Sequence, residues 1–261
     1  MIPKIIWQTY KTKYDELPYD AKICSETWKK LNPEYEYRYM SDDEIYNFVK
    51  DKYGEKMLNL MKSFKVNVMK ADLWRYLIIY EYGGLYTDID TICQVPINKW
   101  LNADNNKMVV APENDLHYAQ WTFAAEPKSP IVKNIIDLVV SRCKNIDYDK
   151  PSFVHYYTAN DVFTEGIRSF FNLPNINHEC ETMTNSHNCW CGYLRNEAMN
   201  YKNNKKMIEN RFYCYNGDMW NIFRDGAVKH VFGSQNWKNG QYEQWVLNPL
   251  AAKSRGYYDI K

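Results

Sequence analysis

The chain has almost no net charge and no long apolar run. Its 33 Lys and Arg residues balance 32 Asp and Glu residues, which leaves a formal net charge of +1 over 261 residues. Nucleic-acid-binding proteins normally carry a strong basic bias, so this balance argues against a nucleic-acid partner. No stretch reaches the roughly 18 apolar residues that a transmembrane helix needs. The nearest, LWRYLIIYEYGGLY at 73–86, is interrupted by Arg75 and Glu81.

The first residues do not resemble a secretory leader, and we expect none. MIPKIIWQTY enters an apparent strand almost at once, which leaves no room for a charged segment followed by an apolar one. Seven cysteines, an odd number, are typical of a reducing compartment when no leader is present. We therefore expect a soluble, cytoplasmic protein without a transmembrane segment.

Neither an internal repeat nor a low-complexity linker divides the chain, so we predict one domain over residues 1–261. Ser41 followed by Glu44 predicts a capping box at a helix start, and Gly54 is expected to close that helix. The opening β-α-β-α order is typical of an α/β sheet with parallel strands. The expected opening elements are a strand at 4–8, a helix at 18–33, a strand at 35–40 and a helix at 41–54.

The segment 67–84 predicts a helix that is buried on most sides, because nearly every position is apolar or aromatic. Asp72 and Arg75 are exceptions, and three residues apart they share one helix face. A buried charged pair is either a structural ion pair or part of a site. Gly83 is expected to cap the helix. Later expected elements are strands at 107–113 and 121–127, a helix at 129–143, and strands at 211–215 and 227–233.

The stretch GGLYTDIDT at 83–91 places two carboxylates at the end of a strand-like run. On one strand face Asp88 and Asp90 would lie roughly 7 Å apart. Like charges that close repel unless a cation lies between them. Hard oxygen ligands suit Mg²⁺ or Mn²⁺, which normally share their shell with substrate phosphates. Ligands collect at the carboxyl ends of strands in α/β sheets, so we predict a metal-bound nucleotide diphosphate here.

Five stretches resemble, in order, one known family. They are IPKIIWQTY, KADLWRYLIIYEYGGLYTDID, FAAEPKSPIVKNIIDLV, YTANDVFTEGI and HVFGSQNW, spread over residues 2–237. The resemblance is to the DXD-containing glycosyltransferases that include fungal Golgi mannosyltransferases and capsular-polysaccharide sugar transferases, with the clostridial glucosylating toxins as more distant relatives. It implies a GT-A fold, a Rossmann-like mixed sheet flanked by helices, here with a loop-rich helical insert.

The resemblance also implies an activity. A metal-dependent enzyme of this kind moves a hexose (mannose, galactose or glucose) from a GDP- or UDP-sugar to a glycan or other hydroxyl acceptor, with retention at the anomeric carbon. Its cofactor is Mn²⁺ or Mg²⁺. Because no membrane anchor is visible, we expect a cytoplasmic enzyme of a bacterial or virus-encoded glycan pathway. The donor base, the acceptor and the oligomeric state stay open.

Residue roles carry over from the matched motifs. Asp72, Arg75, Asp88 and Asp90 are the expected catalytic residues, and Asp72, Arg75 and Asp88 also contact the donor. The metal ligands implied are Asp88, Asp90 and His230. Further donor-binding residues implied by the match are Trp7, Gln8, Tyr10, Gly84, Tyr86, Ser234 and Trp237.

Three departures from the family pattern bear on these roles. The first motif has Trp7 in place of the usual His and Tyr10 in place of the usual Trp, so Tyr10 is the aromatic left to stack on a base. The family's T-G-P becomes Thr158-Ala159-Asn160, which concerns the acceptor side. The late G-S-W is opened to Gly233-Ser234-Gln235-Asn236-Trp237.

Three other functions can be weighed against this one. A haloacid-dehalogenase-type phosphatase keeps its D-x-D near the amino terminus with Thr or Val two residues later, whereas Ile92 stands there and 87 residues precede Asp88. A retaining glycoside hydrolase needs two carboxylates about 5 Å apart and no metal. A catalytically impaired nucleotide-sugar or carbohydrate-binding protein of the same fold is the alternative that stays open.

Histidine and cysteine residues gather in HECETMTNSHNCWCGY at 178–193. Four such side chains can hold zinc, but the spacing fits no standard finger or ribbon. We therefore interpret the segment as a reduced, loop-rich insert and leave a structural zinc site as the alternative. Its candidate ligands are His178, Cys180, His187, Cys189 and Cys191.

Overall fold

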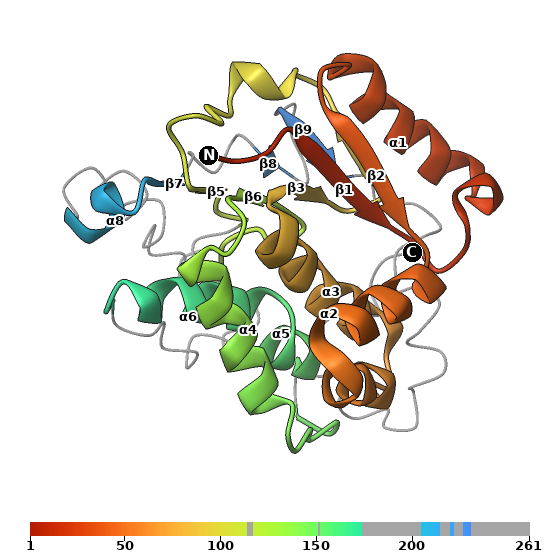
Figure 1. Cartoon of the computed structure of the whole chain (residues 1–261), viewed down its shortest axis with the longest axis vertical. Coiled ribbons are helices and arrows are strands. Elements are labelled where there is room, and N and C mark those ends of the chain that lie inside the picture. Colours follow the sequence, from red (N-terminus) through yellow and green to blue (C-terminus); the bar gives the residue numbers. More distant parts are fainter. Residues whose placement is uncertain (114–116, 151, 174–204, 215–219, 222–226, 231–261) are drawn as a thin grey trace, which may run out of the picture.

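The computed structural model describes residues 1–113, 117–150, 152–173, 205–214, 220–221 and 227–230. Its centre is a six-stranded mixed sheet of order β2-β1-β3-β6-β5-β7, accompanied by a three-stranded sheet of order β4-β9-β8 (Figure 1). In the larger sheet β1 is parallel to β2 and β3, while β6 is antiparallel to β3 and β5. The strands are β1 Ile5–Thr9, β2 Glu36–Met40, β3 Gly84–Thr87, β4 Thr91–Cys93, β5 Met108–Val110, β6 Thr122–Ala125, β7 Phe212–Cys214, β8 Trp220–Asn221 and β9 Val228–His230.

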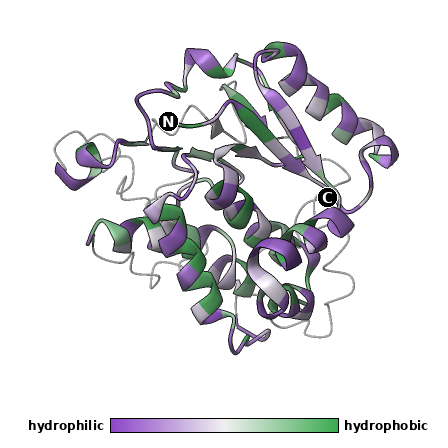
Figure 2. Cartoon of the chain, in the orientation of Figure 1, coloured by the Kyte–Doolittle hydropathy of each residue, from purple (hydrophilic) through white to green (hydrophobic). Residues whose placement is uncertain are grey.

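Helices cover both faces of the larger sheet. Figure 1 shows α2 to α6 gathered on one side of it and α1 on the other. Many of these helices alternate between purple and green in Figure 2, the pattern of amphipathic helices with one buried face. The helices are α1 Tyr19–Leu31, α2 Asp42–Ser63, α3 Asn67–Tyr82, α4 Pro130–Arg142, α5 Phe153–Tyr157, α6 Asn160–Phe170 and α8 Lys205–Glu209, with short 3-10 turns η1 Tyr14–Glu16 and η2 Ile97–Lys99.

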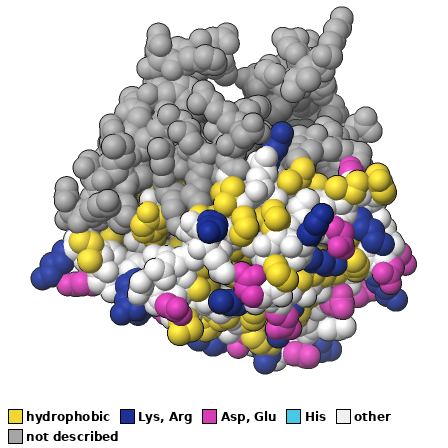
Figure 3. All heavy atoms as spheres, turned by 90° about the horizontal axis from the view of Figure 1, so that it is seen from above, with side chains coloured by type: hydrophobic (Ala, Val, Ile, Leu, Met, Phe, Trp, Pro, Cys, Tyr) yellow, Lys and Arg dark blue, Asp and Glu magenta, His cyan; other side chains and the backbone are white. Residues whose placement is uncertain are grey.

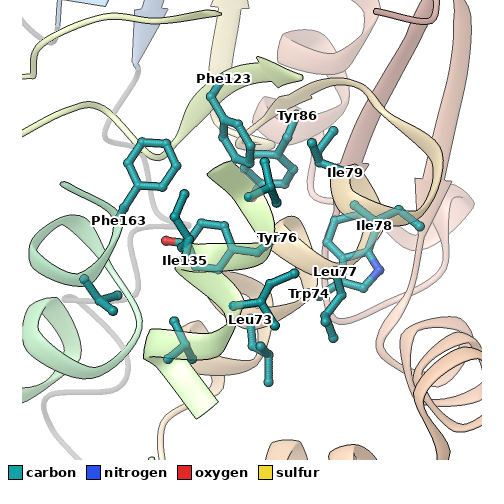
Figure 4. Packing of buried hydrophobic residues seen from close by; sticks show 14 of the residues in the cluster. Leu73, Trp74, Tyr76, Leu77, Ile78, Ile79, Tyr86, Phe123, Ile135 and Phe163 are labelled. Atoms are coloured by element: carbon teal, nitrogen blue, oxygen red, sulfur yellow. The ribbon is translucent and has the colours of Figure 1, made fainter. Parts of the chain in front are cut away.

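Side chains of the larger sheet pack into two separate hydrophobic cores, one on each face. In β3 the ring of Tyr86 joins the cluster under α2 to α6, whereas Leu85 points into the cluster that contains Trp28 of α1. This division follows from the period of two along a strand. Figure 4 shows how α3 enters the larger cluster, with Leu73, Trp74 and Tyr76 packed among rings and aliphatic chains from β3, β6, α4 and α6.

The predicted mixed α/β sheet with flanking helices is confirmed, and so is the parallel β-α-β opening. The capping box is present, since the backbone N–H of Ser41 donates to Glu44 Oε2 at 2.8 Å. The expected end of that helix at Gly54 is wrong. α2 continues to Ser63 through a kink at Gly54, where φ is 78°. Glycine permits this turn of the backbone without ending the helical segment.

The helix α3 ends where it was predicted, and the chain then reverses sharply. Gly83 caps α3 with φ of 66°, and its N–H donates to the carbonyl of Ile79 at 2.8 Å. Gly84 follows with φ of 105° as the first residue of β3. A Cβ on Gly84 would lie 2.7 Å from the carbonyl oxygen of Ile5. The two glycines therefore bring β3 directly against β1.

The surface of the described part mixes charges of both signs. Figure 3 shows Lys and Arg side chains interspersed with Asp and Glu over the visible face, in keeping with the net charge of +1. Within the described ranges no helix is both long and apolar enough to cross a bilayer.

We expect Gly84→Ala to destabilise the protein more than Gly54→Ala. Both glycines have positive φ, so each substitution costs about 1–3 kcal/mol of backbone strain. Only Gly84 adds a collision with backbone, because nothing lies within 4 Å of a Cβ at Gly54. The collision is worth about 1–3 kcal/mol more. Urea unfolding of both variants measures the difference in free energy of unfolding, and equal losses would contradict the packing described.

Candidate active site

The D-I-D motif lies in a tight turn between β3 and β4. Asp88 follows the last residue of β3, and its backbone N–H donates to the carbonyl of Trp121 at 2.8 Å. Its own carbonyl accepts the Thr91 backbone N–H at 3.2 Å and the Thr91 hydroxyl at 2.6 Å. The prediction that Asp88 and Asp90 share one strand face is therefore wrong, because the strand ends before them. Both carboxylates are partly exposed at this turn.

Gln8 of β1 fixes the turn from the neighbouring strand. Its Nε2 donates to the carbonyl of Asp88 at 2.9 Å, and its Oε1 accepts the hydroxyl of Tyr37 at 2.7 Å. The middle residue of the motif, Ile89, packs in a small apolar cluster bordered by Tyr10. Gln8 therefore holds the backbone of the motif, and its predicted role in binding the donor stays a prediction.

A chain of charges links the turn to α3. Arg75 Nη2 lies 2.9 Å from Asp72 Oδ1 and 3.3 Å from Asp88 Oδ1. Tyr86 donates its hydroxyl to the same oxygen of Asp88 at 2.5 Å, and the guanidinium sits 4.6 Å from the centre of the Tyr86 ring. Asp72 and Arg75 are buried, whereas the side chain of Asp88 is 24% exposed. Arg75 therefore joins a buried carboxylate to one that faces solvent.

Two further side chains bind Asp72, and a third, Tyr76, binds both of their residues. Gln120 Nε2 donates to Asp72 Oδ1 at 3.1 Å, and the Thr158 hydroxyl donates to Asp72 Oδ2 at 2.8 Å. The hydroxyl of Tyr76 lies 2.9 Å from Gln120 Oε1 and 2.9 Å from the carbonyl of Thr158. The network joins α3 to the segment before β6 and to the corner between α5 and α6.

Burial controls the ionisation of these groups. It raises the pKa of the Asp72 carboxyl, against the opposing effects of Arg75 and the hydrogen bonds from Gln120 and Thr158. Burial also raises the pKa of Tyr86 well above its ordinary value, so this phenol stays protonated and remains a donor to Asp88. Burial opposes the charge on Arg75, yet the negative charges of Asp88 and Asp72 raise its pKa overall.

One polar atom of Arg75 is left without a partner. Its Nε is buried and makes no hydrogen bond in the described part of the chain. A buried guanidinium N–H costs free energy when it stays unpaired, and such a group is typical of a site that a ligand completes. The rigid fork of arginine suits the hydroxyl and phosphate oxygens of a sugar nucleotide.

The residues at the turn have the chemistry that a hard cation needs. Asp88 and Asp90 offer carboxylate oxygens at a partly exposed position, which suits Mg²⁺ or Mn²⁺ sharing phosphate oxygens with a substrate. The late His230 comes to the same place, since β9 pairs with β4 and its backbone opposes Thr91. Within the described residues no set of three His, Cys, Asp or Glu side chains lies close enough to hold a metal unaided. Substrate oxygens would have to supply the rest of the shell.

Two residues that were predicted to bind the donor are buried within the protein. Trp7 is 1% exposed in the larger core, where its Nε1 donates to the carbonyl of Gly83 at 2.9 Å and its ring stacks on Tyr82. Gly84 is buried against Ile5 and Trp7 of β1. Ser234, Trp237 and the proposed zinc ligands at 178–191 lie outside the described residues.

Sequence reasoning missed Gln120 and Tyr76 as members of this site. Gln120 stands 48 residues from Asp72 with no motif around it, so only the fold reveals the contact. The sequence did single out Thr158-Ala159-Asn160, but the prediction connected these residues with the acceptor. Thr158 turns out to be a hydrogen-bond partner of Asp72.

Comparisons with known proteins agree with the resemblance. Residues 18–107 match a family described as glycosyltransferase sugar-binding region containing DXD motif. The initiation-specific alpha-1,6-mannosyltransferase of Candida albicans is 24% identical over 65% of this chain and 53% of its own length. The enzyme of the same name from Schizosaccharomyces pombe is 26% identical over 70% of this chain and 52% of its own. Inositol phosphoceramide mannosyltransferase 2 of Schizosaccharomyces pombe is 38% identical over 39% of this chain and 28% of its own.

The chain thus spans about half the length of the first two of these relatives. Among solved structures, the PaToxG glycosyltransferase aligns with a TM-score of 0.48 and 19% identity over 65% of this chain and 70% of that one. The expectation of a cytoplasmic protein of bacterial or viral origin is wrong. The relatives that match over most of the chain are fungal mannosyltransferases, of the Golgi group that the resemblance named.

We expect Thr158→Val to destabilise the protein by about 1–3 kcal/mol, because Asp72 Oδ2 loses a donor in a site that water does not reach. Thr12→Val is the matched control, since the Thr12 hydroxyl makes only an exposed contact of 3.4 Å with Lys13. We expect it to change stability by less than about 0.5 kcal/mol. Urea unfolding compares the two, and equal effects would show that the bond to Asp72 contributes little.

Proposed function

We propose that this chain, which carries a DXD-containing sugar-binding region, is a metal-dependent, retaining hexosyltransferase. It takes a hexose from a GDP- or UDP-sugar and transfers it to a hydroxyl group of a glycan or other acceptor. The observation that carries the proposal is the charge chain from buried Asp72 through Arg75 to Asp88 at the D-I-D turn. The relatives named as mannosyltransferases favour a mannosyl donor.

Asp88 and Asp90 are the residues that would hold Mn²⁺ or Mg²⁺, with His230 as the third candidate because β9 brings it beside the turn. The bound cation would neutralise charge on the leaving nucleoside diphosphate. Tyr86 and Arg75 orient Asp88 by binding its Oδ1.

Asp72 and Arg75 would serve the donor sugar together. Asp72, whose oxygens already accept from Arg75, Gln120 and Thr158, would hold Arg75 in place, and the unpaired Nε of Arg75 would donate to an oxygen of the sugar. In the transfer the acceptor oxygen bonds to the anomeric carbon as the bond from that carbon to the diphosphate oxygen breaks. The acceptor proton passes to the released diphosphate, so no protein base is needed. Retention follows when attack and departure occur on the same face of the sugar.

The first test is release of nucleotide from a panel of GDP- and UDP-sugars in the presence of Mn²⁺. We expect turnover of one donor, complete loss with EDTA, and loss of at least about 100-fold in Asp90→Asn, because a metal ligand is removed. Asp104→Asn is the control, since Asp104 is exposed on a loop. It should keep full activity. Proton NMR of the first transfer product determines whether the anomeric configuration is retained.

Two results would count against this proposal. Metal-dependent nucleotide binding without any turnover, also with glycan acceptors present, would indicate the catalytically impaired binding protein instead. Absence of any nucleotide binding would remove the metal role of Asp88 and Asp90 altogether. Calorimetry with GDP and UDP, with and without Mn²⁺, separates these cases.

We expect Arg75→Lys to lower kcat by about 100-fold while the protein stays folded, because a single ammonium cannot reach Asp72, Asp88 and the donor together. Arg38→Lys is the control. Arg38 pairs with Glu36 at an exposed position of β2 and should tolerate the change. Steady-state kinetics and thermal unfolding are measured for both, and an active Arg75→Lys variant would show that its fork is not used.

A further inference from the structure

A second polar cluster lies beside the Asp72 network. It consists of Glu113, His117, Asn160 and Asp161. The Asn160 side-chain amide donates to Glu113, and His117 Nε2 lies 2.8 Å from Asp161 Oδ1. None of these contacts is used by the donor site described above.

The fold makes this cluster a continuation of that network. Gln120 and Thr158 both bind Asp72, and they come from two segments that each reach the cluster within three residues. His117 precedes Gln120 by three residues, and Asn160 follows Thr158 by two. The Tyr118 N–H donates to the hydroxyl of Thr164 at 2.9 Å, which holds the two segments side by side.

The cluster is also held in shape and remains accessible. The Glu113 N–H donates to the carbonyl of His117 at 2.8 Å, which holds the backbones of these two residues together. Both are partly exposed, whereas Asn160 and Asp161 behind them are each 6% exposed. The arrangement has a solvent-facing front and a buried polar back.

One unmet hydrogen bond, on Asn160, indicates what could bind there. Oδ1 of Asn160 is buried and has no partner among the described residues, although Nδ2 of the same amide is used. The amide oxygen of Asn160 only accepts hydrogen bonds, and so do the carboxylates of Glu113 and Asp161 when they are ionised. A ligand bound there must therefore bring donors. Phosphate is disfavoured by its charge. Neutral hydroxyl groups fit best.

We propose that Glu113, His117, Asn160 and Asp161 form the subsite for the hydroxyl-bearing acceptor, a sugar or similar polyol, next to the donor. The inference rests on the proposed function, which supplies the donor on the Asp72 side. The residues bind and orient acceptor hydroxyls and take no part in breaking the donor bond. Asp161 and Glu113 therefore act as positioning residues for the transfer.

The test separates acceptor binding from donor chemistry. Wild type, Glu113→Gln and His117→Gln are assayed with Mn²⁺ and the active donor, first in water alone and then with methyl α-mannoside, methyl α-galactoside or methyl α-glucoside. We expect hydrolysis in water to stay within about twofold, while KM for the best methyl hexoside rises by about tenfold or more. Asp137→Asn, at an exposed pair with Lys133 on α4, should change neither.

The subsite is overturned if KM for every methyl hexoside stays within twofold of wild type, or if hydrolysis and transfer fall in parallel. Should His117→Gln not fold, Glu113→Gln decides alone. If wild type turns over no donor at all, the proposed function fails, and saturation-transfer NMR with the same three methyl hexosides tests the subsite by itself. A signal on wild type that Glu113→Gln loses supports it, and its absence on wild type overturns it.

Discussion

The buried ion pair of Asp72 and Arg75 is the constraint around which the site is arranged. Each charge would be costly in a helix that is otherwise apolar, so both must be satisfied by the surrounding fold. Asp72 obtains its partners from Gln120 and Thr158, and Arg75 reaches Asp88 at the end of β3. Three parts of the chain are thereby held to α3. A structural ion pair alone does not explain why Arg75 keeps one buried N–H unpaired.

A short reversal of the backbone brings the D-I-D motif next to this ion pair. Gly83 and Gly84 turn the chain from α3 directly into β3, so Arg75 and Asp88 lie on the two arms of one reversal. The strand then ends at Thr87, and hydrogen bonds from Gln8 and Thr91 fix the carbonyl of Asp88. The motif sits at the carboxyl ends of β1 and β3, where α/β sheets collect their ligands.

Local sequence patterns predicted the features that depend on residues close together in the chain. The apolar run with its two charges predicted α3 and the Asp72–Arg75 pair, and Ser41 with Glu44 predicted a helix start. The failures needed knowledge of the tertiary structure. The turn at Asp88 depends on hydrogen bonds to Trp121, which lies 33 residues later in the chain (121 − 88), and to Gln8, which lies 80 residues earlier. Trp7 is hidden because its face of β1 is covered by the core under α2 to α6, which no spacing of residues reveals.

The charges gathered at the turn explain why a cation belongs to the proposal. Asp72, Asp88 and Asp90 carry three negative charges against the one positive charge of Arg75, and the guanidinium is already shared between two of the carboxylates. A nucleoside diphosphate would meet net repulsion there. Phosphate binding at this edge of the sheet therefore requires positive charge that these four residues do not supply. A divalent ion between the carboxylates and the diphosphate meets that need, whereas an acceptor hydroxyl, being neutral, can approach the acidic cluster of Glu113 and Asp161 without one.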